Sequence, residues 1–137
     1  MFDYEIIRTM NMTGNIKPTD GELEILNILW DKGPCTVRDV HEVLEATKGS
    51  GYTTTLKLMQ IMLDKGLVKR DSTSRVHIYE AAISKTTTQG QIIRKMVDSV
   101  FSGNTMQMVM QALGNHKADA AELDAIRKYL DEIENKK

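Results

Sequence analysis

The stretch GYTTTLKLMQIMLDKGLVKRDSTSRVHIY, residues 51–79, decides the fold of this chain. Apolar residues recur at helical spacing up to Leu63, and Gly66 predicts the end of that helix. A short strand beginning at Leu67, a polar turn and a return strand over residues 75–81 follow. A helix that leads into a basic two-stranded ribbon is the layout of a winged helix, which places a helix in a DNA groove and a loop against the backbone.

Two further helices are predicted before this stretch. Residues 19–22 (TDGE) and 36–39 (TVRD) carry the capping-box pattern, in which a threonine and an acid three residues later bond each other's backbone amides. Apolar residues follow each box at helical spacing. Gly33 predicts the end of the first helix, and the glycine-rich segment 48–51 the end of the second. We therefore expect residues 17–82 to form one small helical unit with a two-stranded β-wing.

Composition bounds the class of protein. The chain has 137 residues, 41% of them hydrophobic and 27% charged, which predicts one globular domain or two small ones. No apolar run approaches the ~18 residues that a membrane span needs, so we expect no membrane contact. Residues 1–16 show no secretory signal and are interpreted as an N-terminal arm. The single cysteine, Cys35, excludes an internal disulfide and favours a reducing, cytoplasmic location.

The net charge of −1 conceals an uneven distribution of charge. Residues 19–45 carry seven acids against two bases, whereas residues 48–75 carry six bases against two acids. Phosphate attraction depends on the face that a protein presents and not on its total charge. The basic segment coincides with the predicted helix and ribbon. This favours a nucleic-acid contact over a set of merely solvated lysines and arginines.

The predicted third helix and the ribbon supply the candidate DNA contacts. Threonine hydroxyls bond phosphates or base edges, and free amides at a helix start attract phosphate. The helix candidates, which we expect at base edges or, for the tyrosine, at a base or the backbone, are Tyr52, Thr53, Thr54 and Lys57. The ribbon candidates, which we expect at phosphates, are Lys69, Arg70 and Arg75. We expect Thr55 to be exposed beside them. The alternative is an ordinary β-branched helix start that binds nothing.

The chain beyond residue 83 is predicted to be wholly helical. Its three amphipathic segments either pack against the first unit or pair two copies of the chain. Because residues 17–82 account for a complete core, we favour a dimerisation domain over residues 83–137. The predicted dimer contacts are Ile93, Val97, Val100, Phe101, Val109, Leu113, Leu123, Ile126, Leu130 and Ile133. The predicted fold class is thus mainly α with a small β-wing: a winged helix-turn-helix domain followed by an all-helical dimerisation domain.

Signals for catalysis or metal binding are weak. The histidines, His41, His77 and His116, lack metal-ligand spacing, and Cys35 has no histidine or second cysteine beside it. No phosphate-binding glycine loop or nucleophile elbow is found. We therefore expect no catalytic residue, no metal, no cofactor and no enzyme. The alternative to a DNA-binding protein is a winged-helix module that binds other proteins, which the acidic segment 19–45 favours.

Four motifs occur together in this chain. They are TDGELEILNILW at 19–30, YTTTL at 52–56, KGLV at 65–68 and RVHIY at 75–79. In combination they resemble the penicillinase-repressor and methicillin-resistance-repressor family, to which copper-responsive repressors also belong, and the similarity runs from about Pro18 to the C-terminus. The resemblance implies a bacterial winged-helix repressor, dimeric through its helical tail, that binds double-stranded operator DNA at an inverted repeat. It also implies a reading helix over residues 51–65 and a wing over residues 69–79.

Two properties of the family concern how DNA is released. In the antibiotic-responsive members, a membrane-bound sensor protease triggers cleavage between an asparagine and a phenylalanine of the tail. The corresponding segment here, MQAL at 110–113, lacks that pair. The copper-responsive members carry a C-terminal cysteine cluster, whereas this chain ends ENKK. The resemblance therefore names a sensor protease as a partner, but the tail carries neither signal.

Overall fold

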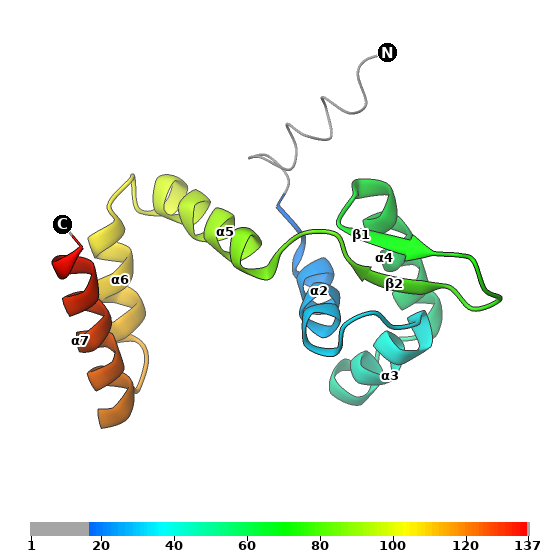
Figure 1. Cartoon of the computed structure of the whole chain (residues 1–137), viewed down its shortest axis with the longest axis horizontal. Coiled ribbons are helices and arrows are strands. Elements are labelled where there is room, and N and C mark those ends of the chain that lie inside the picture. The colour runs from blue at the N-terminus through cyan, green and yellow to red at the C-terminus, as the bar shows by residue number, and fades with distance from the viewer. Residues whose placement is uncertain (1–16, 137) are drawn as a thin grey trace, which may run out of the picture. The chain divides into compact units, whose positions relative to one another are not determined.

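The computed structural model describes residues 17–136, and the expected N-terminal arm lies outside them. The elements, in chain order, are α2 (Asp20–Lys32), α3 (Val37–Lys48), α4 (Tyr52–Lys65), β1 (Val68–Asp71), β2 (Ile78–Ala81), α5 (Lys85–Val100), α6 (Thr105–Gly114) and α7 (Ala120–Asn135) (Figure 1). The chain divides into two compact units that meet between Ile92 and Ile93, within α5. The predicted fold class is confirmed. The assignment of residues 17–82 and 83–137 to separate functions stays a prediction.

Both capping boxes form at the helix starts that the sequence predicts. Thr19 Oγ1 accepts from the Glu22 amide at 3.2 Å, and Glu22 Oε1 accepts from the Thr19 amide at 2.9 Å. Thr36 and Asp39 make the same reciprocal pair at the start of α3, at 3.1 and 3.0 Å. Each box gives partners to amides that a helix start would leave free. The starts of α2 and α3 are therefore set by residues three positions apart.

The end of α4 turns the chain into the wing. Gly66 takes the left-handed conformation with φ of 81°, which glycine adopts without the steric cost of a side chain. The next amide, of Leu67, donates to Met62 O at 2.9 Å. β1 and β2 then pair antiparallel, with Val68 opposite Ala81. The helix and the wing are therefore joined by a single tight turn.

β2 is bonded on both of its edges. One edge pairs with β1. On the other edge, the Cys35 amide donates to Tyr79 O at 2.9 Å and the Tyr79 amide donates to Cys35 O at 2.8 Å. The connection between α2 and α3 is therefore a third, very short partner of the wing, and this fixes the wing beside the start of α3.

The loop of the wing is longer than the sequence predicts. The prediction that the return strand begins at Arg75 is wrong, because pairing begins only at Ile78. Residues 72–77 form the loop, in which Asp71 Oδ1 accepts from the amide and the hydroxyl of Thr73 at 2.9 and 2.7 Å. Such local side-chain bonds offer the backbone an alternative to strand pairing.

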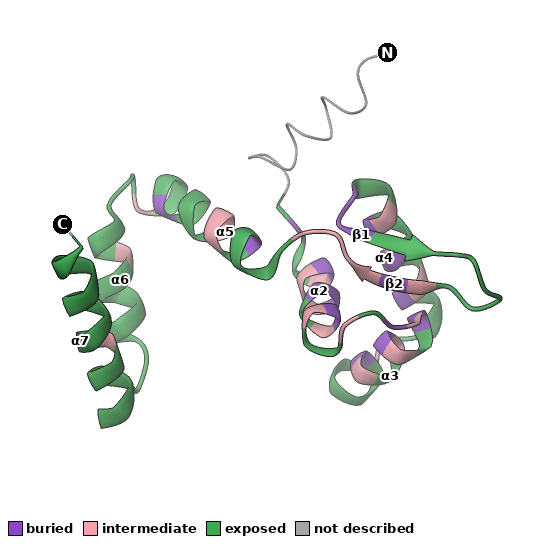
Figure 2. Ribbon diagram, viewed as in Figure 1, coloured by how far each residue is buried: buried purple, intermediate pink, exposed green. Residues whose placement is uncertain are grey.

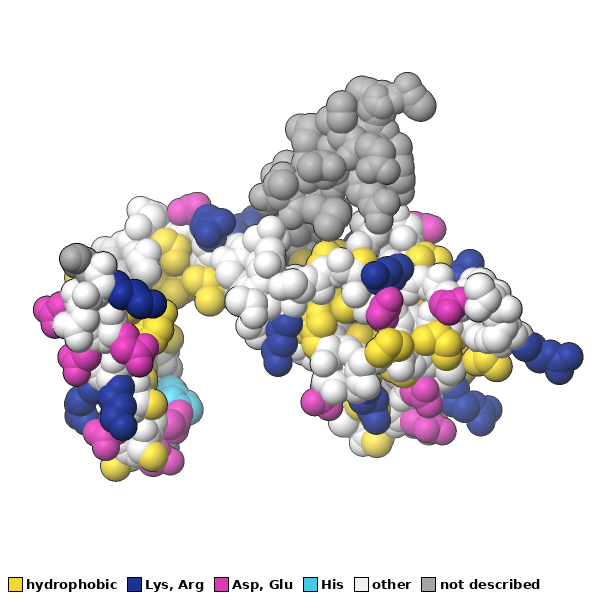
Figure 3. Space-filling model, in the orientation of Figure 1, with side chains coloured by type: hydrophobic (Ala, Val, Ile, Leu, Met, Phe, Trp, Pro, Cys, Tyr) yellow, Lys and Arg dark blue, Asp and Glu magenta, His cyan; other side chains and the backbone are white. Residues whose placement is uncertain are grey.

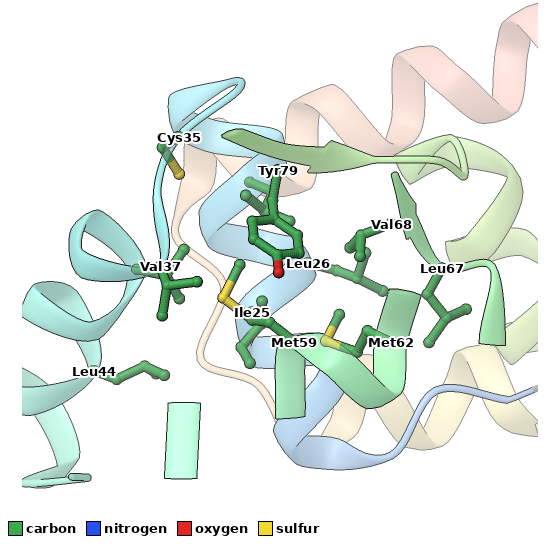
Figure 4. Close-up of a cluster of buried hydrophobic side chains, with 12 residues drawn as sticks. Ile25, Leu26, Cys35, Val37, Leu44, Met59, Met62, Leu67, Val68 and Tyr79 are labelled. Atoms are coloured by element: carbon green, nitrogen blue, oxygen red, sulfur yellow. The ribbon is translucent and has the colours of Figure 1, made fainter. Parts of the chain in front are cut away.

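The core of the first unit draws on its three helices and the wing. Figure 4 shows Tyr79 of β2 reaching in toward Ile25 and Leu26 of α2. The buried cluster consists of Ile25, Leu26, Leu29, Cys35, Val37, Val40, Leu44, Met59, Met62, Leu67, Val68 and Tyr79. Cys35 is 7% exposed, and burial raises the pKa of its thiol. Trp30 Nε1 donates to Ile83 O at 3.0 Å, which ties α2 to the chain beyond β2.

The second unit leaves most of its apolar side chains exposed. Two of its helices start at side-chain caps: Asn104 caps α6, and Asp119 forms a capping box with Glu122 at the start of α7. Among the described residues from 93 onward, Val97 is the buried hydrophobic residue, at 7% exposure. Figure 2 shows α6 and α7 almost wholly exposed. This part of the chain therefore has no core of its own.

Candidate nucleic-acid interface

α4 begins without a side-chain cap. Its N-cap is Gly51, no side chain bonds its first amides, and its first turn contains no acid. The first turns of α2 and α3, in contrast, hold acids in capping boxes. Free amides at a helix start carry the positive end of the helix dipole. The start of α4 is therefore open to an anion such as a phosphate.

The candidate residues of α4 lie on its outer side. Tyr52, Thr53, Thr54 and Lys57 are all exposed, and Tyr52 is 45% exposed. Within the described part of the chain, the side chains of Thr53, Thr54 and Lys57 make no hydrogen bond or ion pair. Their hydroxyl and ammonium groups are consequently available to a ligand.

The expectation that Thr55 is exposed is wrong. Thr55 is 0% exposed, and its hydroxyl donates to Gly51 O at 3.4 Å within the helix. The helical period turns it inward with Met59 and Met62, which follow four and seven residues later and are also fully buried. The three successive threonines therefore divide into two that face solvent and one that belongs to the core.

A groove of about 630 Å³ separates the start of α3, the outer side of α4 and the wing. It is lined by Thr36, Val37, Arg38, Tyr52, Leu56, Gln60, Arg70, Arg75, Val76, His77 and Tyr79. Three of these residues are arginines, from three different segments, and none is an acid. Figure 3 shows Lys and Arg side chains at the end of this unit that carries the wing. The groove therefore presents positive charge over a partly apolar floor.

The two faces of the wing carry different candidates. Successive strand residues point to opposite faces, and Arg70 stands opposite the buried Tyr79, on the face that borders the groove. Lys69 points to the other face, where its Nζ lies 3.4 Å from Glu80 Oε1. The structure thus brings Tyr52, Arg70 and Arg75 together and leaves Lys69 outside the groove.

Local bonds hold the base of the wing loop. The bonds from the amide of Thr73, and next from its hydroxyl, lower the pKa of the Asp71 carboxyl. Arg70 Nε donates to Ser72 Oγ at 3.0 Å, which orients the guanidinium beside the loop. Asp71 is therefore occupied inside the loop by Thr73, and it is absent from the residues that line the groove.

Gln60, Arg38 and His77 are among the groove residues that sequence reasoning missed. Gln60 follows Tyr52 by eight positions on the same side of α4, so helical periodicity could have identified it. Arg38 was missed because it belongs to a segment whose overall charge is acidic. His77 was treated as a residue of the return strand, whereas it lies in the loop. No sequence spacing places Arg38 beside the wing, because that neighbourhood depends on the backbone pairing of Cys35 with Tyr79.

No group of three or more His, Cys, Asp or Glu side chains within residues 17–136 is arranged to hold a metal ion. No helix in this range is long and apolar enough to cross a bilayer. The three histidines lie in separate segments of the chain: His41 in α3, His77 in the wing loop and His116 after α6.

The three-helix head and its two-stranded wing define a winged-helix protein. The family model described as penicillinase repressor matches residues 18–132. The chain belongs to this family, whose members are transcriptional repressors and not enzymes, and the predicted family is confirmed.

Individual relatives agree with this family. The transcriptional regulator BlaI of Mycobacterium tuberculosis is 30% identical over 118 residues, which cover 83% of this chain and 84% of that protein. The penicillinase repressor of Bacillus licheniformis is 21% identical over 119 residues, which cover 87% of this chain and 93% of that protein. The solution structure of the DNA-binding domain of the repressor BlaI matches with a TM-score of 0.47 and 22% identity, over 53% of this chain and 93% of that one.

Proposed function

We propose that this protein is a homodimeric repressor that binds double-stranded DNA sequence-specifically at a dyad-symmetric operator. The observation that carries the proposal is the groove: three arginines and no acid, beside a helix start without a cap. Phosphate contacts supply most of the affinity of DNA-binding proteins, and base contacts supply the direct readout of sequence. Both kinds of donor are present in the first unit.

The donors divide by position. Thr53, Thr54 and Lys57 project from the outer side of α4 without partners, which suits them to base edges in the major groove. Arg70 and Arg75 border the groove beside the wing and suit phosphates, as does the newly identified Arg38. Tyr52, the first residue of α4, lines the groove together with the arginines. We assign α4 as the reading helix and the wing as a backbone contact.

The second unit supports the homodimer. Seven of the predicted contact residues are between 36% and 68% exposed: Ile93, Val100, Val109, Leu113, Leu123, Leu130 and Ile133. Val97 is buried within one chain, and Phe101 and Ile126 are half-buried. A monomer rarely leaves so many large apolar side chains in water. A second copy of the same tail is the simplest cover, and it would present two reading helices to two half-sites.

The names of the relatives support repression as the outcome. They are called a transcriptional regulator and a penicillinase repressor. A dimer bound over a promoter would exclude polymerase sterically. We propose that release of DNA does not involve cleavage at residues 110–113, the segment that corresponds to the protease site of the family. Residues 110–113 lie inside α6, so a protease would first have to unwind that helix.

Selection of DNA from a random duplex pool by the full-length chain tests the proposal. We expect an inverted repeat to be enriched, and we expect it to bind in the presence of nonspecific competitor DNA. The double variant Arg38→Ala with Arg75→Ala should bind this duplex much more weakly. The matched control is Arg127→Ala, because Arg127 pairs with Asp124 in α7, far along the chain from the groove. Enrichment of no duplex, or of a single half-site only, would contradict the proposal.

The alternative function is a winged-helix module that binds other proteins. Such a module does not require a binding groove without acidic residues, whereas a DNA-binding surface does. If the wild-type chain fails to shift any duplex at low salt while it remains folded and dimeric, the protein-binding function becomes the better explanation.

A further inference from the structure

His41 lies in α3, with its ring against Tyr52 of α4 and one ring nitrogen buried without a hydrogen-bond partner. Its side chain is 14% exposed. Within residues 17–136, its Nδ1 is the buried side-chain polar atom without a hydrogen-bond partner. Its Nε2 lies 3.6 Å from Glu45 Oε2, which is too long for a hydrogen bond. A buried polar atom without a partner reduces stability, so an apolar residue would serve better if His41 only filled space.

The ring of His41 packs edge-to-face with the ring of Tyr52. The two centroids are 5.4 Å apart and the planes meet at 79°. This geometry is favourable beyond the burial of the rings. The connection between their helices contains Gly49 and Gly51, which are conformationally permissive. A side-chain contact across this connection therefore restricts a ring that the local backbone would leave free.

Tyr52 is the ring that stands at the candidate interface. It is the first residue of α4, it is 45% exposed, and it lines the groove together with the three arginines. His41 does not line the groove. Any influence of His41 on a ligand in the groove must therefore pass through Tyr52 or through the fit of α3 against α4.

We propose that His41 is a positioning residue, which holds the Tyr52 ring so that its hydroxyl is presented to DNA at the start of the reading helix. The inference rests on the proposed function, because the position of Tyr52 matters only if DNA enters the groove. The phosphate contacts of the arginines do not depend on His41. Its loss should therefore weaken binding to the operator without changing the dependence of binding on salt.

A double-mutant cycle on the full-length protein tests this inference. The probe is the duplex selected by the wild-type chain, with a scrambled duplex of equal length for comparison. His41→Leu keeps the volume and removes the ring, and it should weaken binding to the selected duplex roughly two- to tenfold. His41→Phe retains a ring and should restore binding. In a Tyr52→Ala background, His41→Leu should have no further effect.

Controls separate this role from a structural one. Thermal unfolding of each variant shows whether the fold is retained, and His41→Phe should raise Tm because it removes the unpaired nitrogen. His116→Ala, in the tail, is the matched histidine control and should bind as the wild type does. The inference is overturned if His41→Leu binds as tightly as the wild type, or if it weakens binding equally with and without Tyr52. If the wild-type chain selects no duplex, the proposed function fails and this inference fails with it.

Discussion

Glu22 Oε2 lies 2.8 Å from Lys65 Nζ, although the two residues are 43 positions apart in the sequence. The Glu22 side chain is 2% exposed and the Lys65 side chain is 38% exposed. The same carboxylate also accepts from the Thr19 amide in the capping box of α2. One acid therefore serves both the start of α2 and the end of α4, and it holds α4 against α2.

Removal of Lys65 should destabilise the first unit. Lys65→Met keeps the aliphatic stem but leaves the buried Glu22 carboxylate without its cation, so we expect a loss of about 1–3 kcal/mol in the free energy of unfolding. Lys48 pairs with Glu24 at 2.7 Å, but both of these side chains are well exposed. Lys48→Met should therefore cost less than about 1 kcal/mol. Urea denaturation compares the two variants, and equal losses would show that Glu22 does not need Lys65.

Arg75 should contribute more to phosphate binding than Lys69 does. Arg75 lines the groove, whereas Lys69 lies on the other face of the wing beside Glu80. We expect Arg75→Ala to weaken binding to all duplexes and to reduce the slope of log K against log salt by about 1. Lys69→Ala should reduce it less. Fluorescence anisotropy at four salt concentrations measures both slopes, and a larger effect of Lys69→Ala would place DNA on the outer face of the wing.

Thr54 and Thr55 should respond differently to the same substitution. Thr54→Val removes an exposed, unpaired hydroxyl, so we expect a loss of roughly 1 kcal/mol of discrimination at one base pair with little effect on stability. Thr55 is fully buried and its hydroxyl bonds within the helix. Thr55→Val should leave base preference unchanged. Competition with operator duplexes that carry single base-pair changes measures the preference, and altered specificity in Thr55→Val would contradict the assignment.

A charge in the apolar face of the tail should separate the dimer. Leu130 is 58% exposed in one chain, and Leu130→Asp would place an unpaired carboxylate in the proposed interface. Sedimentation should then show a species of 15.5 kDa instead of twice that mass, with weaker binding to the inverted repeat. Ala125→Asp adds the same charge to an exposed position of α7 outside the predicted dimer contacts and should remain dimeric. A dimeric Leu130→Asp would move the interface elsewhere.

The capping box of α3 should make stability depend on pH. In the folded chain, the pKa of the Asp39 carboxyl lies below its ordinary value of 3.8. The hydrogen bond from the Thr36 amide is the larger cause, and the hydrogen bond with the Thr36 hydroxyl is the next. Because the folded pKa is the lower one, Asp39 stabilises the fold above pH 3.8, and this contribution is lost as pH falls through the lowered value. At pH 7, Asp39→Ala should therefore unfold at a lower urea concentration than the wild type. The difference between the two midpoints should disappear as the pH falls below the lowered pKa of Asp39.

The elements of this fold were predictable where their determinants are local. A capping box joins residues three positions apart, and a glycine ends a helix through its own φ, so the starts of α2, α3 and α7 and the end of α4 follow from short segments. The start of the return strand was mispredicted because two local signals compete there. Alternating residue types indicate a strand from Arg75, whereas the bonds of Asp71 with Thr73 favour a loop, and residues 72–77 form that loop.

The candidate site was predictable only in part. The outer side of α4 was predicted correctly except at Thr55, where a polar residue type was given more weight than a position four and seven residues before the buried Met59 and Met62. Charge identified Arg70 and Arg75 but not their neighbours. Arg38 was hidden because charge summed along a segment does not describe charge gathered across a fold.

By itself, the order of residues determined the helices, the wing and the kinship with the repressors, since each depends on patterns that short stretches carry. Tertiary structure alone decided which face of the wing meets the groove and that Arg38 belongs to it. It also decided that Glu22 serves two helices. The physical reason is that these relationships depend on contacts between distant segments, namely the backbone pairing of Cys35 with Tyr79 and the ion pair of Glu22 with Lys65, and the residues of the ion pair are 43 positions apart.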